Sequence, residues 1–155
     1  MILPEPSKPI EQQTEAVLSR LLLWGEARGE GAIGMLAVLW CAYNRLGKNG
    51  TSLRDVILKP WQFSTFNRND SNRDKLLKAH VQEPDAYKMA DTVATLMEAG
   101  HTNDPTHGAT HYCTDALWGR PKEFITAKWF EDECIADGRT KETFRHGHHV
   151  FGITA

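Results

Sequence analysis

The chain has 155 residues, with 18 Lys and Arg against 20 Asp and Glu, so its formal net charge is −2 at pH 7. This length is typical of one domain with a sizeable core and is too short for two ordinary domains. The charge gives no electrostatic basis for binding nucleic acid, which needs an excess of basic side chains. The cysteines Cys41, Cys113 and Cys134 lack metal-binding or redox spacing, so we expect no disulfide framework.

Residues 1–10 contain three prolines and no uninterrupted apolar segment, which does not resemble a secretory signal. We therefore expect an N-terminal extension over 1–10 and a single folded domain over 11–155. The apolar run 32–43 has the length of a core helix and is too short to span a membrane, so we expect no membrane insertion.

Two helices are predicted in the first third of the chain. Apolar Val17, Leu21 and Trp24 recur at helical spacing and predict a helix from Gln12 to about Ala27. The segment 32–46 is apolar nearly all round, which is typical of a helix buried at the centre of a domain. Helices are therefore expected to dominate the fold.

Further elements follow in the rest of the sequence. Ser52 to Asp55 has the pattern of a capping box and predicts a short helix that stops before Pro60. Another helix is predicted from Pro84 to Ala99. Short extended segments are expected at 110–113, 125–130 and 149–153. The predicted class is mainly α (α+β), with a buried central helix and a small β or extended region.

A polar island separates the first two predicted helices. It contains Glu26 and Glu30, and the glycines at 29 and 31 argue against a continuous helix, since each costs about 1 kcal/mol there. In the last turn of the first helix, Glu26 would lie near unpaired carbonyls, which disfavour an ionised carboxylate, and burial would act in the same direction. A raised pKa suits a general acid. The alternative is a solvated pair of carboxylates on one helix face, and the residues alone leave both interpretations open.

An ordered set of motifs extends from Leu21 to Phe151 and resembles the SleB/CwlJ family of cell-wall hydrolases. Its parts are Glu26-Ala-Arg-Gly-Glu30, a helix with Ala37-Val38 that ends in Asn44-Arg45, Val56, Gln62-Phe63-Ser64, Gly108 to Tyr112, Trp118 and His149-Val150-Phe151. An ordered set is far more specific than one short motif. The resemblance implies a lysozyme-like catalytic domain that cleaves the MurNAc–GlcNAc β-1,4 bond of peptidoglycan as a lytic transglycosylase.

The resemblance carries the family's catalytic glutamate onto Glu26, and Glu30 is the alternative catalyst. One carboxylate would act first as acid and then as base, so we expect no metal and no other cofactor. Sugar sites combine flat aromatic faces with hydrogen-bonding groups. The expected substrate-binding residues are Gln62, Phe63, Ser64, Thr110, His111, Tyr112, Trp118 and His149, of which the last two depend mainly on the resemblance. Packing in the core is the alternative for the aromatic members, and Asn44 and Arg45 are expected to fix the end of their helix.

The substrate would be peptidoglycan glycan strands, which lie outside the inner membrane. Spore-type relatives are expected to carry an export signal and often a wall-binding segment, and this sequence shows neither pattern. A phage endolysin and an enzyme packaged into a virion would both reach the wall without a signal. Of the two we expect a bacteriolytic phage endolysin, made in the host cytoplasm without a signal peptide. It would reach the periplasm through a holin-like membrane lesion and act there as a monomer.

Three alternatives stay open. One is a muramidase-type hydrolase with a second carboxylate. Another is a zinc amidase, because His107 and His111 are four residues apart and 146–149 is rich in histidine, although no His-Glu-x-x-His motif is present. The last is a non-catalytic wall-binding or virion structural module, since a fold alone does not prove an activity.

Overall fold

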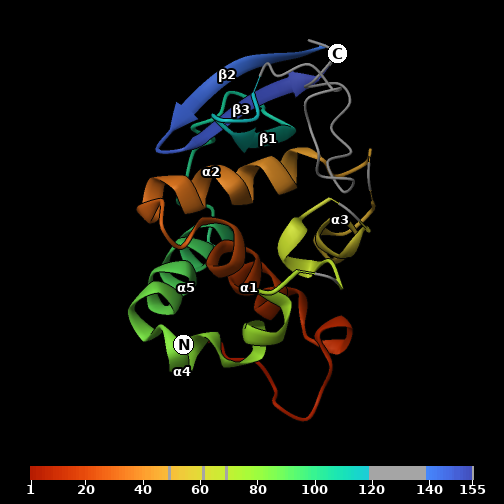
Figure 1. The fold of residues 1–155 in the computed structure, drawn as a ribbon, viewed down its shortest axis with the longest axis vertical. Helices are drawn as coiled ribbons and strands as arrows, with labels where there is room; N and C mark the ends of the chain where they lie inside the picture. The colour runs from red at the N-terminus through yellow and green to blue at the C-terminus, as the bar shows by residue number, and fades with distance from the viewer. Residues whose placement is uncertain (49, 61, 69, 119–138, 155) are drawn as a thin grey trace.

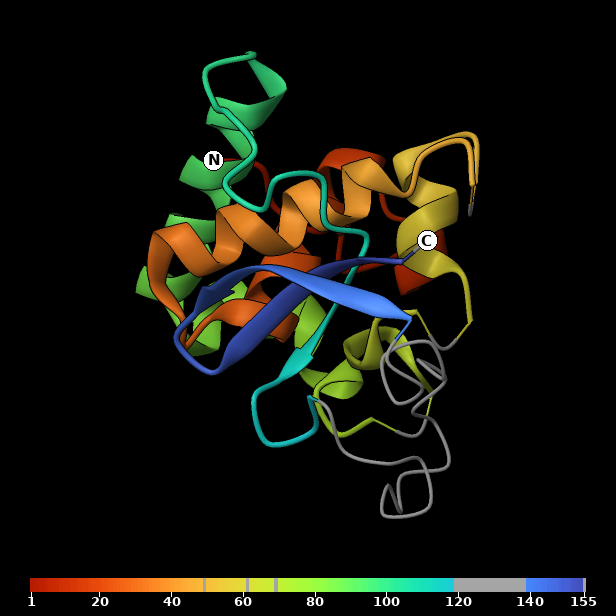
Figure 2. The ribbon, with the colours of Figure 1, turned by 90° about the horizontal axis from the view of Figure 1, so that it is seen from above.

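The structure is a computed structural model that describes residues 1–48, 50–60, 62–68, 70–118 and 139–154. Three strands form one layer over helix α2, and helices α1 and α5 lie on the other side of α2 (Figure 1). The view from above shows β2 and β3 lying across α2 (Figure 2). The described helices and strands are α1 (Glu15–Ala27), α2 (Gly31–Asn44), α3 (Leu53–Leu58), α4 (Ala79–Gln82), α5 (Pro84–Glu98), β1 (His111–Thr114), β2 (Thr140–His146) and β3 (His149–Thr154), with 3₁₀ turns η1 (Ile10–Gln12), η2 (Ser64–Phe66) and η3 (Arg73–Lys78).

The predicted helices are confirmed, with small shifts at their ends. The Thr14 side chain accepts a hydrogen bond from the backbone N–H of Val17 at 3.2 Å, so α1 begins later than the apolar spacing indicated. Ser52 caps α3 in the same way, by accepting from Asp55 N at 3.1 Å. Gly100 ends α5 with a φ of 76°, a conformation that favours glycine. None of the described helices is long and apolar enough to cross a membrane.

The sheet is antiparallel with the strand order β1-β3-β2. Strands were expected at 110–113 and 149–153, and β1 and β3 confirm them, whereas 125–130 lies outside the described residues. Strand β2 was not predicted from the sequence. Among the described strands it pairs only with β3, and most of its residues are exposed or half-buried, so it lacks the apolar pattern of a buried strand. The mainly α (α+β) class is confirmed.

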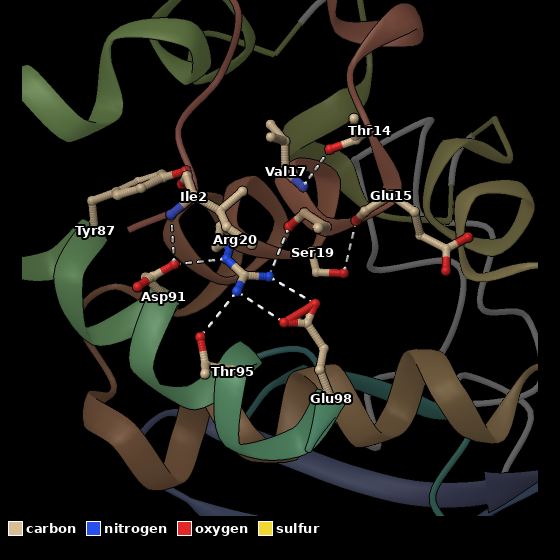
Figure 3. Close-up of polar contacts among 11 residues, drawn as sticks. Ile2, Thr14, Glu15, Val17, Ser19, Arg20, Tyr87, Asp91, Thr95 and Glu98 are labelled. Atoms are coloured by element: carbon tan, nitrogen blue, oxygen red, sulfur yellow. Dashed lines mark hydrogen bonds and ion pairs between the residues drawn. The ribbon is translucent and has the colours of Figure 1, made fainter. Parts of the chain in front are cut away.

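Helices α1 and α5 are joined by an ion cluster around Arg20, which is fully buried (Figure 3). Its Nε donates to Asp91 Oδ1 at 2.9 Å, and its two terminal nitrogens donate to the Glu98 carboxylate at 2.8 and 2.9 Å. A buried guanidinium needs such partners, because an unpaired buried charge is very costly. The cluster therefore fixes α1, which carries Glu26, against the rest of the core.

The N-terminal segment lies against the same helices. The backbone N–H of Ile2 donates to Asp91 at 3.2 Å, and the Tyr87 hydroxyl donates to the carbonyl of Ile2 at 2.8 Å. The Gln13 side chain then bonds to the backbone of Glu5 and Lys8. The segment 1–10 thus packs along the domain, and the boundary between an extension and a domain at residue 11 stays a prediction.

Candidate active site

Glu26 lies in the last turn of α1, where two other segments meet it. Ser64, at the start of η2, places its Oγ 3.4 Å from Glu26 Oε2. The hydroxyl of Tyr112, from the middle of β1, forms a hydrogen bond to the same carboxyl group. The Glu26 side chain is partly exposed. Parts of the chain far apart in sequence therefore hold one carboxyl group that a ligand can still reach.

The protein environment raises the pKa of Glu26 from an ordinary 4.5 to about 7. Loss of solvation on burial is the largest cause, because it disfavours the charged form. The hydrogen bond from Tyr112 lowers the pKa, and the negative charge of Asp70 raises it. The raised pKa expected from the sequence is confirmed, and Glu26 is present in both protonation states near neutral pH.

Gly25 explains how η2 comes so close to α1. A Cβ atom at Gly25 would lie 2.1 Å from Thr65 Oγ1, a distance that no real side chain tolerates. Only glycine leaves room for Thr65 at this point of the helix, even though glycine weakens a helix interior. The close contact positions the neighbouring Ser64 beside Glu26.

Tyr112 is fixed by aromatic neighbours on several sides. Its ring centroid lies 6.3 Å from that of Phe63, 5.1 Å from His149 and 5.3 Å from Phe151. Burial raises the pKa of Tyr112 well above its usual value, so the phenol stays neutral. A neutral phenol keeps its proton and can donate it in a hydrogen bond to the Glu26 carboxylate.

Asp70 is a second carboxylate near Glu26 and was not among the site residues predicted from the sequence. Its Oδ1 accepts from the backbone N–H of Asn72 at 2.8 Å, and Asn72 Oδ1 in turn accepts from Arg28 at 3.2 Å. Arg28 follows Glu26 at the end of α1, and its guanidinium lies 4.2 Å from the Trp24 ring centroid. This chain of contacts holds the Asp70 loop beside α1. No local sequence pattern marks Asp70, because its proximity to Glu26 depends on the tertiary fold.

Glu30 makes contacts different from those of Glu26. Its Oε2 accepts from the backbone N–H of His148 at 3.2 Å, and its carbonyl oxygen lies 3.0 Å from His146 Nε2. A Cβ at Gly147, whose φ is 56°, would lie 1.7 Å from Glu30 Oε2. The Glu30 carboxylate is therefore packed against the turn between β2 and β3. Its role as the alternative catalyst stays a prediction.

Arg45 and Asn44 fix the end of α2, as the sequence predicted. Arg45 donates to the carbonyl of Thr110 and to Gln62 Oε1, the latter at 3.1 Å, and its guanidinium lies 4.9 Å from the Phe63 ring centroid. Asn44 donates to Asp104 at 2.9 Å and to Ala109 O at 3.0 Å. Gln62 and the buried Phe63 are thus held close to β1 and to Tyr112.

His111 lies on β1 with its side chain on the face opposite to Tyr112, because successive strand residues alternate. Its Nδ1 is 2.9 Å from Thr110 Oγ1 and 2.8 Å from Thr154 Oγ1. Burial lowers the pKa of His111 to about 4, and the charge of Arg45 acts in the same direction, so the imidazole is neutral. Thr110 itself is buried. Contact of either residue with substrate stays a prediction.

Trp118 lies close to strand β3, and His149 is the first residue of that strand. Trp118 is half-buried, and a Cβ at Gly152 of β3 would lie 2.8 Å from its Cη2. His149 is buried, and no described group hydrogen-bonds to its Nδ1. The pKa of His149 is lowered, because the effect of burial outweighs the opposite effect of the nearby Glu30 charge. His149 therefore contacts the Tyr112 ring as a neutral imidazole.

The histidines that motivated the zinc hypothesis form no cluster with metal-binding geometry among the described residues. Across residues 1–48, 50–60, 62–68, 70–118 and 139–154, no three His, Cys, Asp or Glu side chains are grouped so that they could hold a metal ion. The described residues therefore offer no metal centre to add to the site at Glu26.

The chain is similar to a known protein family and to a solved structure. The profile of a family described as Cell Wall Hydrolase matches residues 29–152, a range that begins after Glu26 and so does not test that residue. The crystal structure of the catalytic domain of the Bacillus cereus SleB protein matches with a TM-score of 0.54 and 20% identity, over 96% of this chain and 94% of that one. At this identity the match shows a shared fold. No curated protein gives a significant match.

Proposed function

Since the chain belongs to the SleB/CwlJ-type family of cell wall hydrolases, we propose that it is a lytic transglycosylase that cleaves the MurNAc–GlcNAc β-1,4 bond of peptidoglycan, with Glu26 as its single catalytic residue. The observation that carries the proposal is the Glu26 carboxyl group, partly exposed and with a pKa raised to about 7. A group that must both give and take a proton near neutral pH works best with such a pKa.

The reaction has two proton transfers through Glu26. The protonated carboxyl group gives its proton to the glycosidic oxygen as the bond from that oxygen to MurNAc C1 breaks. The resulting carboxylate then takes the proton of the MurNAc 6-hydroxyl, whose oxygen forms a bond to C1. This internal nucleophile is held in the same sugar at high effective concentration, so no second carboxylate is needed.

The neighbours of Glu26 support this cycle. The hydrogen bond from neutral Tyr112 stabilises the carboxylate that exists between the two transfers, and Ser64 Oγ, 3.4 Å away, adds a second polar contact. Loss of solvation and the charge of Asp70 disfavour the ionised form of Glu26, so they favour return of the carboxylate to its protonated form. In this proposal the sugar contacts come from Gln62, Phe63, Ser64, Thr110, His111, Tyr112, Trp118 and His149.

Analysis of the cleavage products tests the transglycosylase mechanism. Purified walls digested with the protein should release fragments that end in 1,6-anhydroMurNAc, one water lighter than a reducing end, and borohydride should leave these ends unchanged. Mostly reducible MurNAc ends would contradict the proposal. Release of intact peptides from uncut glycan would indicate an amidase instead.

A muramidase-type hydrolase is the second candidate, and the charge of Asp70 beside Glu26 favours it. Hydrolysis by two carboxylates needs a second group as nucleophile or as base for water. An Asp70→Asn variant separates the two mechanisms. The hydrolase would lose at least about 100-fold in rate, whereas the transglycosylase would keep its anhydro products and change mainly in pH dependence.

The proposed biological role is host lysis as a phage endolysin, acting as a monomer that reaches the wall through a holin-like lesion. Expression of the protein alone inside bacteria tests this role. The protein should accumulate without lysis until the inner membrane is permeabilised. Prompt lysis on expression alone would show another route to the wall.

A further inference from the structure

A groove on the side of the molecule formed by η1, α3 and η2 is separate from the contacts of Glu26. It has a volume of about 420 Å³. The 3₁₀ turns η2 and η3, which contribute Phe66 and Arg73 to the lining, both contact α1. The side chains that line it and carry the argument are Glu11, Leu58, Pro60, Phe66, Arg68 and Arg73.

One arginine of the groove is structural and the other is available to a ligand. Arg73 donates to the carbonyl of Phe66 at 2.6 Å and forms an ion pair with Glu11, so its guanidinium joins two walls of the groove. Arg68 is exposed and forms no ion pair with a carboxylate in the described part of the chain. The charge of Arg68 also acts on the Glu11 carboxylate, whose pKa it lowers, but the lining has two arginines and one carboxylate, so the groove carries a net positive charge.

The rest of the lining is apolar. Leu58 is half-buried, Phe66 is almost fully buried and Pro60 is exposed. An apolar floor with an exposed guanidinium at its rim fits a ligand that has short aliphatic side chains and a free carboxylate, because Arg binds carboxylates through two parallel hydrogen bonds. A neutral sugar would leave the net positive charge of the groove unbalanced.

The turn η2 links this groove to the site at Glu26. Ser64, at the start of η2, contacts Glu26, and Phe66, at its end, lines the groove. Two residues of chain span at most about 7 Å, so the two features lie on either side of one short turn. A substituent that leaves a sugar bound at Glu26 can thus reach the groove, since a four-residue extended peptide spans about 13 Å.

We propose that this groove binds the acidic stem peptide attached to the lactyl group of MurNAc, with a stem carboxylate on Arg68 and the alanine methyl groups on the apolar floor. The proposal rests on the function proposed above, because it assumes that a MurNAc unit lies at Glu26. It makes the enzyme selective for glycan strands that carry stem peptides.

Direct binding of a soluble tetrapeptide stem tests the proposal without any cleavage. Titration calorimetry on the full chain should show that Arg68→Gln weakens binding at least tenfold. Lys88→Gln is the matched control, because it removes one positive charge from an exposed position on α5, and it should change binding less than twofold. A stem whose glutamate carboxylate is amidated should bind the wild-type protein at least tenfold more weakly.

Equal binding by the wild-type protein and Arg68→Gln, or no binding by the wild-type protein, would overturn the proposal. Self-association of the wild-type protein that Arg68→Gln abolishes would assign the groove to a second copy of the chain instead, and would also overturn it.

Cleavage assays distinguish a failure of the proposed stem site from a failure of the proposed glycosidic reaction. The wild-type protein should show a KM at least tenfold lower on strands with stem peptides than on strands stripped of them, and Arg68→Gln should lose this preference while Lys88→Gln keeps it. Equal KM values on both substrates would refute the stem site and leave the glycosidic reaction standing. Stem binding without cleavage of either substrate would refute the glycosidic reaction alone.

Discussion

Replacement of Glu26 by Gln is expected to abolish wall lysis and at the same time to stabilise the protein. The amide is nearly isosteric with the carboxyl group, so the contacts of α1 with Ser64 and Tyr112 can persist. It has no transferable proton, and general acid or base catalysis contributes about 10²- to 10⁴-fold in rate. Because Glu26 serves in both steps, we expect a loss of at least about 10³-fold.

The stability gain follows from the pKa of Glu26. A pKa raised from 4.5 to about 7 means that the folded state resists ionisation that the unfolded chain allows. Stability is therefore lost as the pH rises from about 4.5 to about 7, and at 1.36 kcal/mol per tenfold change the loss above pH 7 is about 3 kcal/mol at most. Glu26→Gln removes this cost, which corresponds to a rise in Tm of roughly 6–12 °C for a chain of this size.

Urea unfolding and muropeptide release from purified walls measure the two effects. Near pH 8 the Glu26→Gln variant should be more stable than the wild-type protein, and near pH 4 the difference should disappear because the wild-type carboxyl group is protonated in both states. Glu30→Gln is the control for activity and should retain measurable lysis. The reasoning is refuted if Glu26→Gln still lyses walls, or if its stability relative to the wild-type protein does not depend on pH.

Three further predictions concern the site and its surroundings. Asp70→Asn removes a negative charge that raises the pKa of Glu26, so the alkaline limb of the pH–rate profile should move to lower pH. A limb that stays in place or moves to higher pH would contradict the effect of Asp70 on Glu26. Gly25→Ala should lower the free energy of unfolding by about 1–3 kcal/mol and reduce lysis, because its Cβ displaces Thr65, and urea titration measures the first effect. Extensive dialysis against a chelator should leave lysis of purified walls nearly unchanged, whereas activity that disappears and returns with zinc would exclude the single-carboxylate mechanism.

Local patterns in the sequence predicted most of the helices. The apolar spacing around Leu21, the cap at Ser52 and the stop at Gly100 each involve interactions within a few residues, so the sequence alone carries them. The same local reasoning placed Glu26 in the last turn of α1 and gave a raised pKa as one of two interpretations that it left open. It missed β2, because an edge strand with mostly exposed residues has no apolar alternation to detect.

The surroundings of Glu26 depended on the tertiary structure. Tyr112 and Asp70 act on the carboxyl group from β1 and from the loop after η2, and no spacing in the sequence indicates that these segments meet at α1. The structure also shows that the two glutamates have different surroundings, since Glu30 packs against the turn at Gly147 whereas Glu26 contacts Ser64. The sequence by itself therefore determined the helices and the position of Glu26 at the end of α1, because those depend on neighbouring residues. Only the fold decided which distant side chains set the charge and contacts of that acid, because electrostatics and burial act through space.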